Sequence, residues 1–169
     1  MRQTPFTVPV HDLINRPGTM RDTSIEVKLD ETLGNYAISV PAGAAIEVKL
    51  RLESVHEGIY VTGEVDSTAV GECSRCLEAV REPVEVDFQE LFAYSGSSED
   101  DLLVEGDQID LEQAVRDAVV LSLPFQPVCS TDCLGLCIQC GEKIKDESQH
   151  QHEANIDPRW SALKKLKED

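Results

Sequence analysis

Four cysteines that could bind a metal ion lie close together in this sequence: Cys129, Cys133, Cys137 and Cys140. The two-residue gap between the last two, followed at once by Gly141, is typical of a metal-binding knuckle. A residue without Cβ allows a tight turn that directs backbone N–H groups toward thiolate sulfur. The three-residue gap between the first two also lies within the usual range for paired zinc ligands. Because four thiolates leave no open coordination position for a substrate, we expect a structural zinc site.

A second cysteine pair, Cys73 and Cys76, lies far upstream. It has the same two-residue gap, so it could share one ion with Cys137 and Cys140 and fasten the C-terminal segment to the rest of the protein. The pair also admits a redox interpretation, since Arg75 between the thiols would favour the thiolate and a two-residue gap can close a disulfide. No βαβ pattern surrounds it, however, as would be expected around a thioredoxin-like motif.

A third ligand set would join His150 and His152 to Cys137 and Cys140. Both side chains can supply imidazole nitrogen, although a gap of one residue is unusual for two histidines on one zinc. Spacing leaves all three sets open. The set from Cys129 to Cys140 is favoured, because closing a short loop costs less chain entropy than closing a long one.

No catalytic motif accompanies these residues. The sequence has no G-x-S-x-G, no P-loop, no H-E-x-x-H and no G-x-G-x-x-G. The acidic stretch 95–107 does not have the spacing of an EF-hand and is expected to be a solvated loop. We therefore expect a protein that is not an enzyme and that takes no small-molecule substrate.

The net charge of −17 over 169 residues argues against indiscriminate binding to nucleic acid, because the phosphates would be repelled. Nothing near the N-terminus resembles a signal peptide, and no apolar run approaches the roughly 18 residues that span a bilayer. We expect a cytoplasmic protein without membrane contact, in which cysteines are metal ligands or redox thiols more readily than disulfides.

The rest of the sequence predicts an α+β fold with an antiparallel sheet or partly closed barrel, one core helix, a C-terminal zinc loop and a short terminal helix. Alternating apolar and charged residues predict a hairpin over 46–66 that turns near His56. A helix is predicted from Leu111 to about Leu123, capped by Asp110. Further strands are expected at 24–29, 36–40 and 84–89. No internal repeat is apparent.

Two regions are expected from this pattern. Residues 1–123 would form the α+β body with an N-terminal arm. Residues 124–169 would form the cysteine-rich loop and a terminal helix that begins near Asp157, with Pro158 at its first position.

Five short elements occur in an order that resembles the YceD family, the large ribosomal RNA subunit accumulation proteins. They are Glu57-Gly58, Cys73-Ser74-Arg75-Cys76-Leu77-Glu78, Leu121-Ser122-Leu123-Pro124, the run from Cys133 to Gly141, and Asp157-Pro158-Arg159. The resemblance implies a bacterial cytosolic protein that helps to make or stabilise large-subunit ribosomal RNA, with no known enzymatic reaction. Some family branches keep the Cys-x-Arg-Cys element without the later cysteines, which favours a self-contained zinc site. In the zinc-bearing branch, a later cysteine pair is common where this chain has His150 and His152.

The resemblance and the six cysteines together lead to three functional hypotheses. The first is an assembly factor whose direct partner is large-subunit ribosomal RNA or a basic ribosomal protein. The second is a thiol- or zinc-based redox-responsive protein. The third is a structural adaptor between proteins, without RNA contact. The candidate residues for contact with RNA or a partner are Arg75, Arg159, Lys164 and Lys165.

Overall fold

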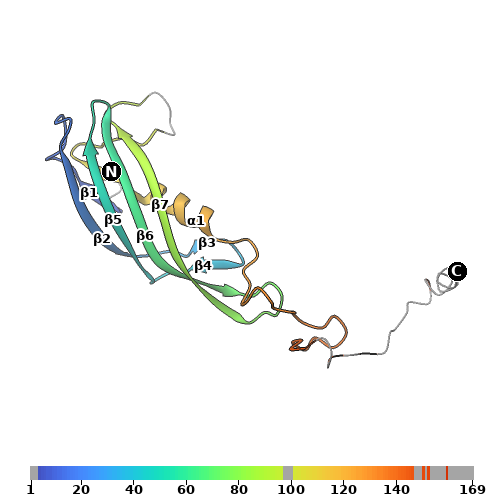
Figure 1. The fold of residues 1–169 in the computed structure, drawn as a ribbon. Helices are drawn as coiled ribbons and strands as arrows, with labels where there is room; N and C mark the ends of the chain where they lie inside the picture. The colour runs from blue at the N-terminus through green and yellow to red at the C-terminus, as the bar shows by residue number, and fades with distance from the viewer. Residues whose placement is uncertain (1–3, 97–100, 147–149, 151, 153–158, 160–169) are drawn as a thin grey trace, which may run out of the picture.

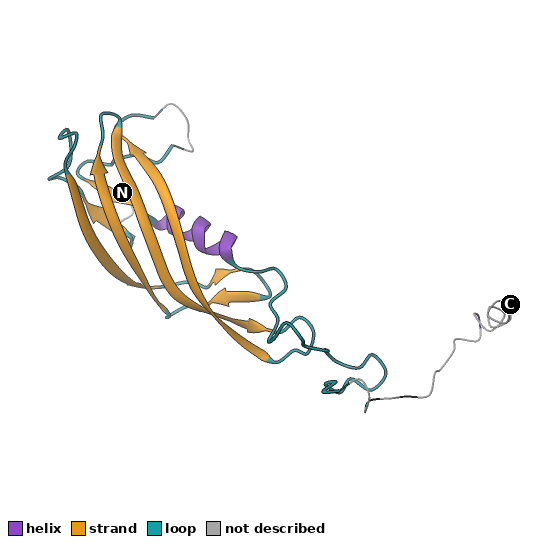
Figure 2. Ribbon diagram, viewed as in Figure 1, coloured by secondary structure: helices purple, strands orange, loops and turns teal. Residues whose placement is uncertain are grey.

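A computed structural model describes residues 4–96, 101–146, 150, 152 and 159. Its main feature is a long, twisted antiparallel sheet with one helix lying along one face (Figure 1). After the helix the chain runs as loops past one end of the sheet (Figure 2). The predicted terminal helix near Asp157, together with Lys164 and Lys165, lies outside the described residues.

The sheet is organised around one long strand, β6 (Gly58–Glu72). One edge of β6 pairs with β7 (Ala79–Ala93) over the whole length of both strands. The other edge pairs first with β5 (Ala45–Ser54) and then, near the far end of β6, with the short β4 (Ile38–Val40). The strands β2 (Met20–Lys28) and β3 (Leu33–Gly34) extend the sheet beyond β5 and β4. A separate two-stranded sheet joins β1 (Thr7–Pro9) to β8 (Gln108–Asp110).

The alternation in the sequence produces the two faces of the sheet. On β5, the apolar residues Ile46, Val48 and Leu52 are fully buried, while the charged residues between them point to solvent. The predicted hairpin and its turn are confirmed: Leu52 lies opposite Val61 in the register. The inner face thus forms one continuous core.

The helix α1 (Glu112–Ser122) covers this inner face and packs against β7 and β3. Its buried side includes Val115 and Val119, as the sequence predicted. The carboxylate of Asp110 accepts a hydrogen bond from the N–H of Glu112 at 3.0 Å, so the predicted capping residue does stabilise the first turn. The helix ends at Ser122, and the extended backbone of Leu123 directs the chain toward the cysteine-rich segment.

The fold differs from the expectation in two respects. The sheet is open, since its outer strands β2 and β7 do not pair with each other in the described part of the chain, so the partly closed barrel is not formed. The short strands β1, β3 and β8 were not predicted, because two or three residues carry too little alternation to be recognised. Within the described residues, no helix is both long enough and apolar enough to cross a membrane.

Candidate metal sites

The structure brings the predicted ligands together in two groups, each of which could hold a metal ion. Within each group, the sulfur and nitrogen atoms that could bind a metal all lie within 4.8 Å of one another. The first group, here called the four-cysteine site, is Cys73, Cys76, Cys129 and Cys133; the second, the cysteine–histidine site, is Cys137, Cys140, His150 and His152.

This grouping corrects the way in which the sequence analysis combined the ligands. The four consecutive cysteines from Cys129 to Cys140 do not converge on one point: the first two belong to one group and the last two to the other. The upstream knuckle does not share a group with the downstream knuckle either. Of the three proposed sets, the one that joins two histidines to Cys137 and Cys140 is present as a group.

The four-cysteine site joins two distant parts of the chain. Cys73 and Cys76 lie in the connection between β6 and β7, and Cys129 and Cys133 follow α1. The sulfur atoms of Cys73 and Cys133 are 3.8 Å apart, and those of Cys76 and Cys129 are 3.6 Å apart. A disulfide would need about 2.05 Å. Tetrahedral zinc with Zn–S bonds of about 2.3 Å sets its sulfur atoms about 3.8 Å apart, so the spacing fits a four-thiolate site.

Hydrogen bonds to backbone carbonyls hold the segment of Cys73 and Cys76 against the segment of Cys129 and Cys133. The carbonyl of Pro127 accepts hydrogen bonds from both the N–H and the hydroxyl of Ser74, at 2.8 and 3.0 Å. The guanidinium of Arg75 donates to the carbonyls of Thr131 and Cys133, at 3.2 and 2.9 Å. The site is therefore assembled by the surrounding backbone and by contacts between the two segments.

Gly135 allows the second segment to approach this closely. The N–H of Leu136 donates to the carbonyl of Arg75 at 3.0 Å. A Cβ added at Gly135 would lie 2.9 Å from that same carbonyl oxygen, and the φ angle of +81° favours glycine. A side chain at this position would push the two segments apart.

The cysteine–histidine site lies next to the first, on the following turn of chain. Cys140 Sγ is 3.4 Å from His150 Nε2, and His150 Nε2 is 2.9 Å from His152 Nε2. Cys137 is buried, whereas Cys140 and His152 are exposed. Lys143 forms an ion pair with Glu78, which links this turn to the upstream knuckle.

Both Cys-x-x-Cys elements adopt one backbone conformation. In the first, the N–H of Cys73 donates to the carbonyl of Glu78 at 2.7 Å, and the N–H of Leu77 donates to the carbonyl of Cys73 at 2.9 Å. In the second, the N–H of Cys137 donates to the carbonyl of Glu142 at 2.8 Å, and the N–H of Gly141 donates to the carbonyl of Cys137 at 2.8 Å. The residue after the second cysteine has positive φ in both, +60° at Leu77 and +75° at Gly141.

This shared geometry shows that the chain does contain a short repeat, which the sequence analysis overlooked. Both elements have the pattern Cys-x-x-Cys-x-Glu, at residues 73–78 and 137–142. The glutamate at the same position in both elements could have indicated two equivalent knuckles. Each knuckle would then need its own pair of additional ligands.

Backbone N–H groups stabilise the thiolate form of the first cysteine in each knuckle. The backbone N–H of Cys129, together with those of Cys76 and Arg75, lowers the pKa of Cys73 to about 6. The N–H groups of Cys140 and Gln139 lower the pKa of Cys137 to about 6 in the same way. Burial, in contrast, raises the pKa of Cys133. The first cysteine of each knuckle is thus the sulfur atom most ready to donate to a cation.

Of the residues predicted to contact RNA or a partner, the structure describes Arg75 and Arg159. Arg75 lies at the surface, but its guanidinium bonds the backbone of the downstream segment. Arg159 is exposed. Lys164 and Lys165 lie outside the described residues.

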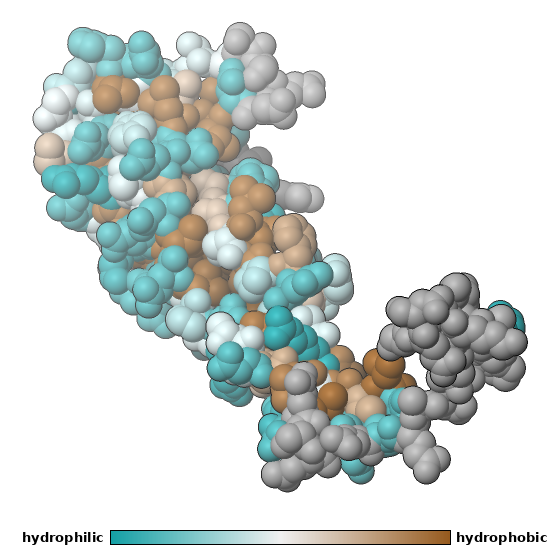
Figure 3. Space-filling model, turned by 45° about the vertical axis from the view of Figure 1, so that its right-hand side comes forward, coloured by the Kyte–Doolittle hydropathy of each residue, from teal (hydrophilic) through white to brown (hydrophobic). Residues whose placement is uncertain are grey.

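The surface near the metal sites is partly apolar. Figure 3 shows apolar side chains at the end of the molecule where the loops meet the sheet, as well as along its body. The exposed residues there include Leu77, Phe125, Leu134 and Ile138.

The outer face of the sheet carries the acidic charge. Four exposed or half-exposed carboxylates occupy successive positions in one row across four strands, where each lies opposite the next: Glu26, Glu47, Asp66 and Glu85. The next row places Glu64 opposite Asp87. One cation stands within these two rows, Lys49, which lies opposite Glu64 and bonds Asp66 at 2.7 Å.

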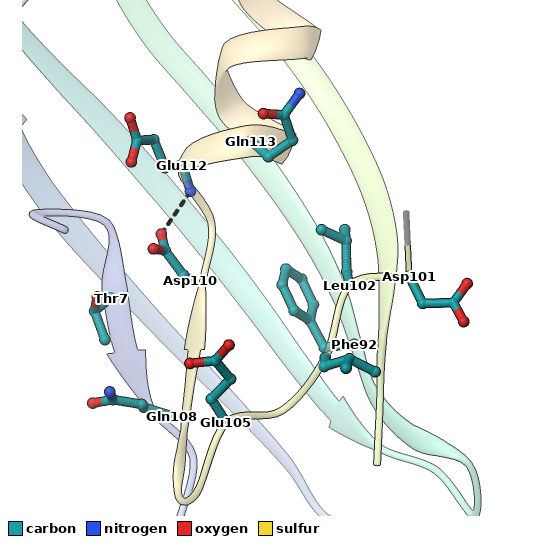
Figure 4. A pocket seen from close by; sticks show the side chains of 10 residues that line it. Thr7, Phe92, Asp101, Leu102, Glu105, Gln108, Asp110, Glu112 and Gln113 are labelled. Carbon is teal, nitrogen blue, oxygen red and sulfur yellow. Dashed lines mark hydrogen bonds between the residues drawn. The ribbon is translucent and has the colours of Figure 1, made fainter. Parts of the chain in front are cut away.

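A hollow of about 540 Å³ lies at the other end of the helix, between β1, β8 and the chain that follows β7 (Figure 4). Its lining includes the carboxylates of Asp101, Glu105, Asp110 and Glu112 but no lysine, arginine, histidine or cysteine. In the part of the chain that the structure describes, these carboxylates do not form a metal-binding group.

Comparison with known proteins identifies the family. A sequence profile described as "Large ribosomal RNA subunit accumulation protein YceD" matches residues 61–167. The chain belongs to the YceD family. This chain is 46% identical over 167 residues to the uncharacterized protein Rv2926c of Mycobacterium tuberculosis, an alignment that covers 95% of this chain and 80% of the relative.

Two further relatives extend the similarity to other bacteria. The uncharacterized protein ML1660 of Mycobacterium leprae is 39% identical over 168 residues, covering 95% of this chain and 76% of the relative. The uncharacterized protein YlbN of Bacillus subtilis is 34% identical over 110 residues, covering 60% of this chain and 64% of the relative. No solved structure matches this chain.

Proposed function

We propose that this protein supports the accumulation of large-subunit ribosomal RNA as a non-enzymatic cytoplasmic factor in ribosome biogenesis. The observation that carries the proposal is membership of the YceD family, whose description gives that role. The absence of catalytic motifs from the sequence is consistent with a binding role.

We further propose that the four-cysteine site holds structural zinc. Four thiolates at tetrahedral spacing leave no position for a substrate, as expected of a structural ion. In this role the metal fastens the loop between β6 and β7 to the segment that follows α1. The apolar surface near this end of the sheet then keeps a fixed shape.

The direct partner in this proposal is a basic ribosomal protein. The row of carboxylates on the outer face of the sheet would repel RNA phosphates but attract lysine and arginine side chains. The alternative hypotheses predict different outcomes. Direct contact with RNA would give RNA crosslinks in cells, and a redox role would give reversible oxidation of the thiols after mild peroxide.

The test replaces the chromosomal gene by a Cys76→Ser variant, with Asp132→Asn in the same loop as the matched control. We expect the ratio of large- to small-subunit ribosomal RNA to fall in a gene deletion and in Cys76→Ser, and to stay at the wild-type value in Asp132→Asn. An unchanged ratio in the deletion strain would refute the proposed function. A reduced ratio in the deletion with an unchanged ratio in Cys76→Ser would refute only the role of the metal.

A second measurement tests the partner. Affinity capture at low salt after crosslinking, followed by mass spectrometry, should recover basic ribosomal proteins linked to the carboxylates of the sheet. RNA crosslinks without any such protein would contradict a protein-mediated role.

A further inference from the structure

The four-cysteine site is complete without the cysteine–histidine site, because the two groups have no residue in common. We propose that Cys137, Cys140, His150 and His152 form a second, separate tetrahedral site for a zinc-class divalent ion. The protein would then bind two metal ions of different ligand chemistry, one held by four thiolates and one by two thiolates and two imidazoles.

The first support for this site is its backbone. The Cys137–Cys140 knuckle has the same two backbone hydrogen bonds as the Cys73–Cys76 knuckle and the same positive φ after its second cysteine. The N–H of Gln139 points at Cys137 Sγ, 3.4 Å away, as expected where backbone dipoles stabilise a thiolate. A knuckle of this kind supplies two adjacent ligands and needs two more to close a structural site.

The second support is the placement of the two imidazoles. Tetrahedral zinc separates a thiolate sulfur from an imidazole nitrogen by about 3.6 Å, and two imidazole nitrogens by about 3.3 Å, from the usual bond lengths. The structure has 3.4 Å between Cys140 Sγ and His150 Nε2 and 2.9 Å between the two Nε2 atoms. The rings stand at 76° to each other, so the nitrogens meet without the rings stacking. An ion would need the histidines to separate by only a few tenths of an ångström.

The simpler interpretation is a chain of hydrogen bonds from thiol to imidazole to imidazole. Such a chain at the surface competes with water for every bond and gains little. It also leaves unexplained why four different metal-binding atoms, including that of the buried Cys137, converge within 4.8 Å.

Exposure distinguishes this site from the first. Three of the four ligands of the four-cysteine site are buried, whereas only Cys137 is buried in the second site. Solvent and competing ligands therefore reach the second ion more easily, and we expect it to exchange faster.

The experiment is native mass spectrometry of the full-length protein, expressed with zinc and purified without chelator. Wild type should carry two zinc ions. A His150→Ala/His152→Ala variant should carry one, and so should Cys76→Ser. The matched control is His56→Ala, an exposed histidine in the turn between β5 and β6, which should keep both.

Cadmium-113 NMR of the cadmium-substituted protein identifies which ion is lost, because the chemical shift depends on the number of thiolate ligands. The histidine variant should keep only the four-thiolate signal, which also shows that it is folded. Timed release to a chromophoric chelator should remove the cysteine–histidine ion first.

Two results would overturn the proposal: a histidine variant that carries as many zinc ions as wild type, or a histidine variant that has also lost a four-thiolate cadmium signal present in wild type. The test is independent of the four-cysteine site. If that site holds no zinc, Cys76→Ser leaves the stoichiometry unchanged, whereas the histidine variant still loses one ion.

Discussion

Removing the negative charge of Glu85 should stabilise this protein. Glu85 lies on β7 directly opposite Asp66 on β6, and both side chains face solvent on the outer face of the sheet. Like charges at directly opposite positions in an antiparallel pair are destabilising. The change Glu85→Gln removes this repulsion, and Glu85→Lys replaces it by attraction.

The size of the effect follows from the register. Two carboxylates on opposed residues lie about 6 Å apart, so their repulsion is about 0.7 kcal/mol in water at low salt. At an ionic strength of about 0.15 M, screening reduces this to about 0.3 kcal/mol, and at 1 M to about 0.1 kcal/mol. Because Lys49 pairs with Asp66 and offsets part of this repulsion, Glu85→Gln should gain at most about 0.7 kcal/mol at low salt, and Glu85→Lys at most about twice that.

Urea unfolding of the zinc-loaded protein at low and high salt measures this gain as a change in the free energy of unfolding. Glu57→Gln, in the turn between β5 and β6, makes the same charge change away from the acidic rows and serves as the control. In an Asp66→Asn background, the gain from Glu85→Gln should shrink, because the repelling partner is already neutral.

Two results would refute this reasoning. One is a gain that does not decrease between low and high salt. The other is a gain in Glu57→Gln equal to that in Glu85→Gln, which would make the effect one of total charge and not of the cross-strand pair.

Three further predictions concern packing and backbone geometry. Gly63→Ala should lower the free energy of unfolding by about 1–3 kcal/mol, measured by urea titration, because the added Cβ would lie 2.2 Å from the ring of Phe88. Ser54→Ala should cost about 1–2 kcal/mol in the same assay, since the buried hydroxyl donates to the carbonyl of Leu13 at 2.6 Å. Gly141→Val should cost about 1–2 kcal/mol at φ +75°, which would appear in chelator competition as roughly tenfold weaker zinc binding at the cysteine–histidine site alone.

The sheet and the helix could be predicted because their signals are local and regular. Residues 46–53 and 59–66 alternate on either side of a turn, and the capping Asp110 stands directly before the apolar stripe of α1. The pairing of β1 with β8 could not be predicted in this way. It joins three-residue strands about a hundred positions apart, and only the packed core brings them together.

For the candidate metal sites, the sequence analysis named all eight residues of the two groups but combined them differently from the structure. The local spacing of Cys129, Cys133, Cys137 and Cys140 suggested one site. Spacing along the chain does not determine which way a side chain points. The turn at Gly135, whose backbone conformation brings Leu136 to the carbonyl of Arg75, separates the two pairs.

The argument from loop entropy failed for a specific reason. Closing the loop of about fifty residues between Cys76 and Cys129 costs about 2 kcal/mol more than closing one of four residues, if both loops are free chains. The long loop is not a free chain, because β7 is paired along β6 and α1 packs against β7. Folding of the core therefore provides most of that closure before any metal binds. Only the short segment from Pro124 to Cys133 remains to be positioned. The hydrogen bonds that Ser74 and Arg75 donate to this segment hold it in place. Two cysteines distant in sequence, Cys76 and Cys129, thus lie with their sulfur atoms 3.6 Å apart, and the four-cysteine site depends on the completed sheet.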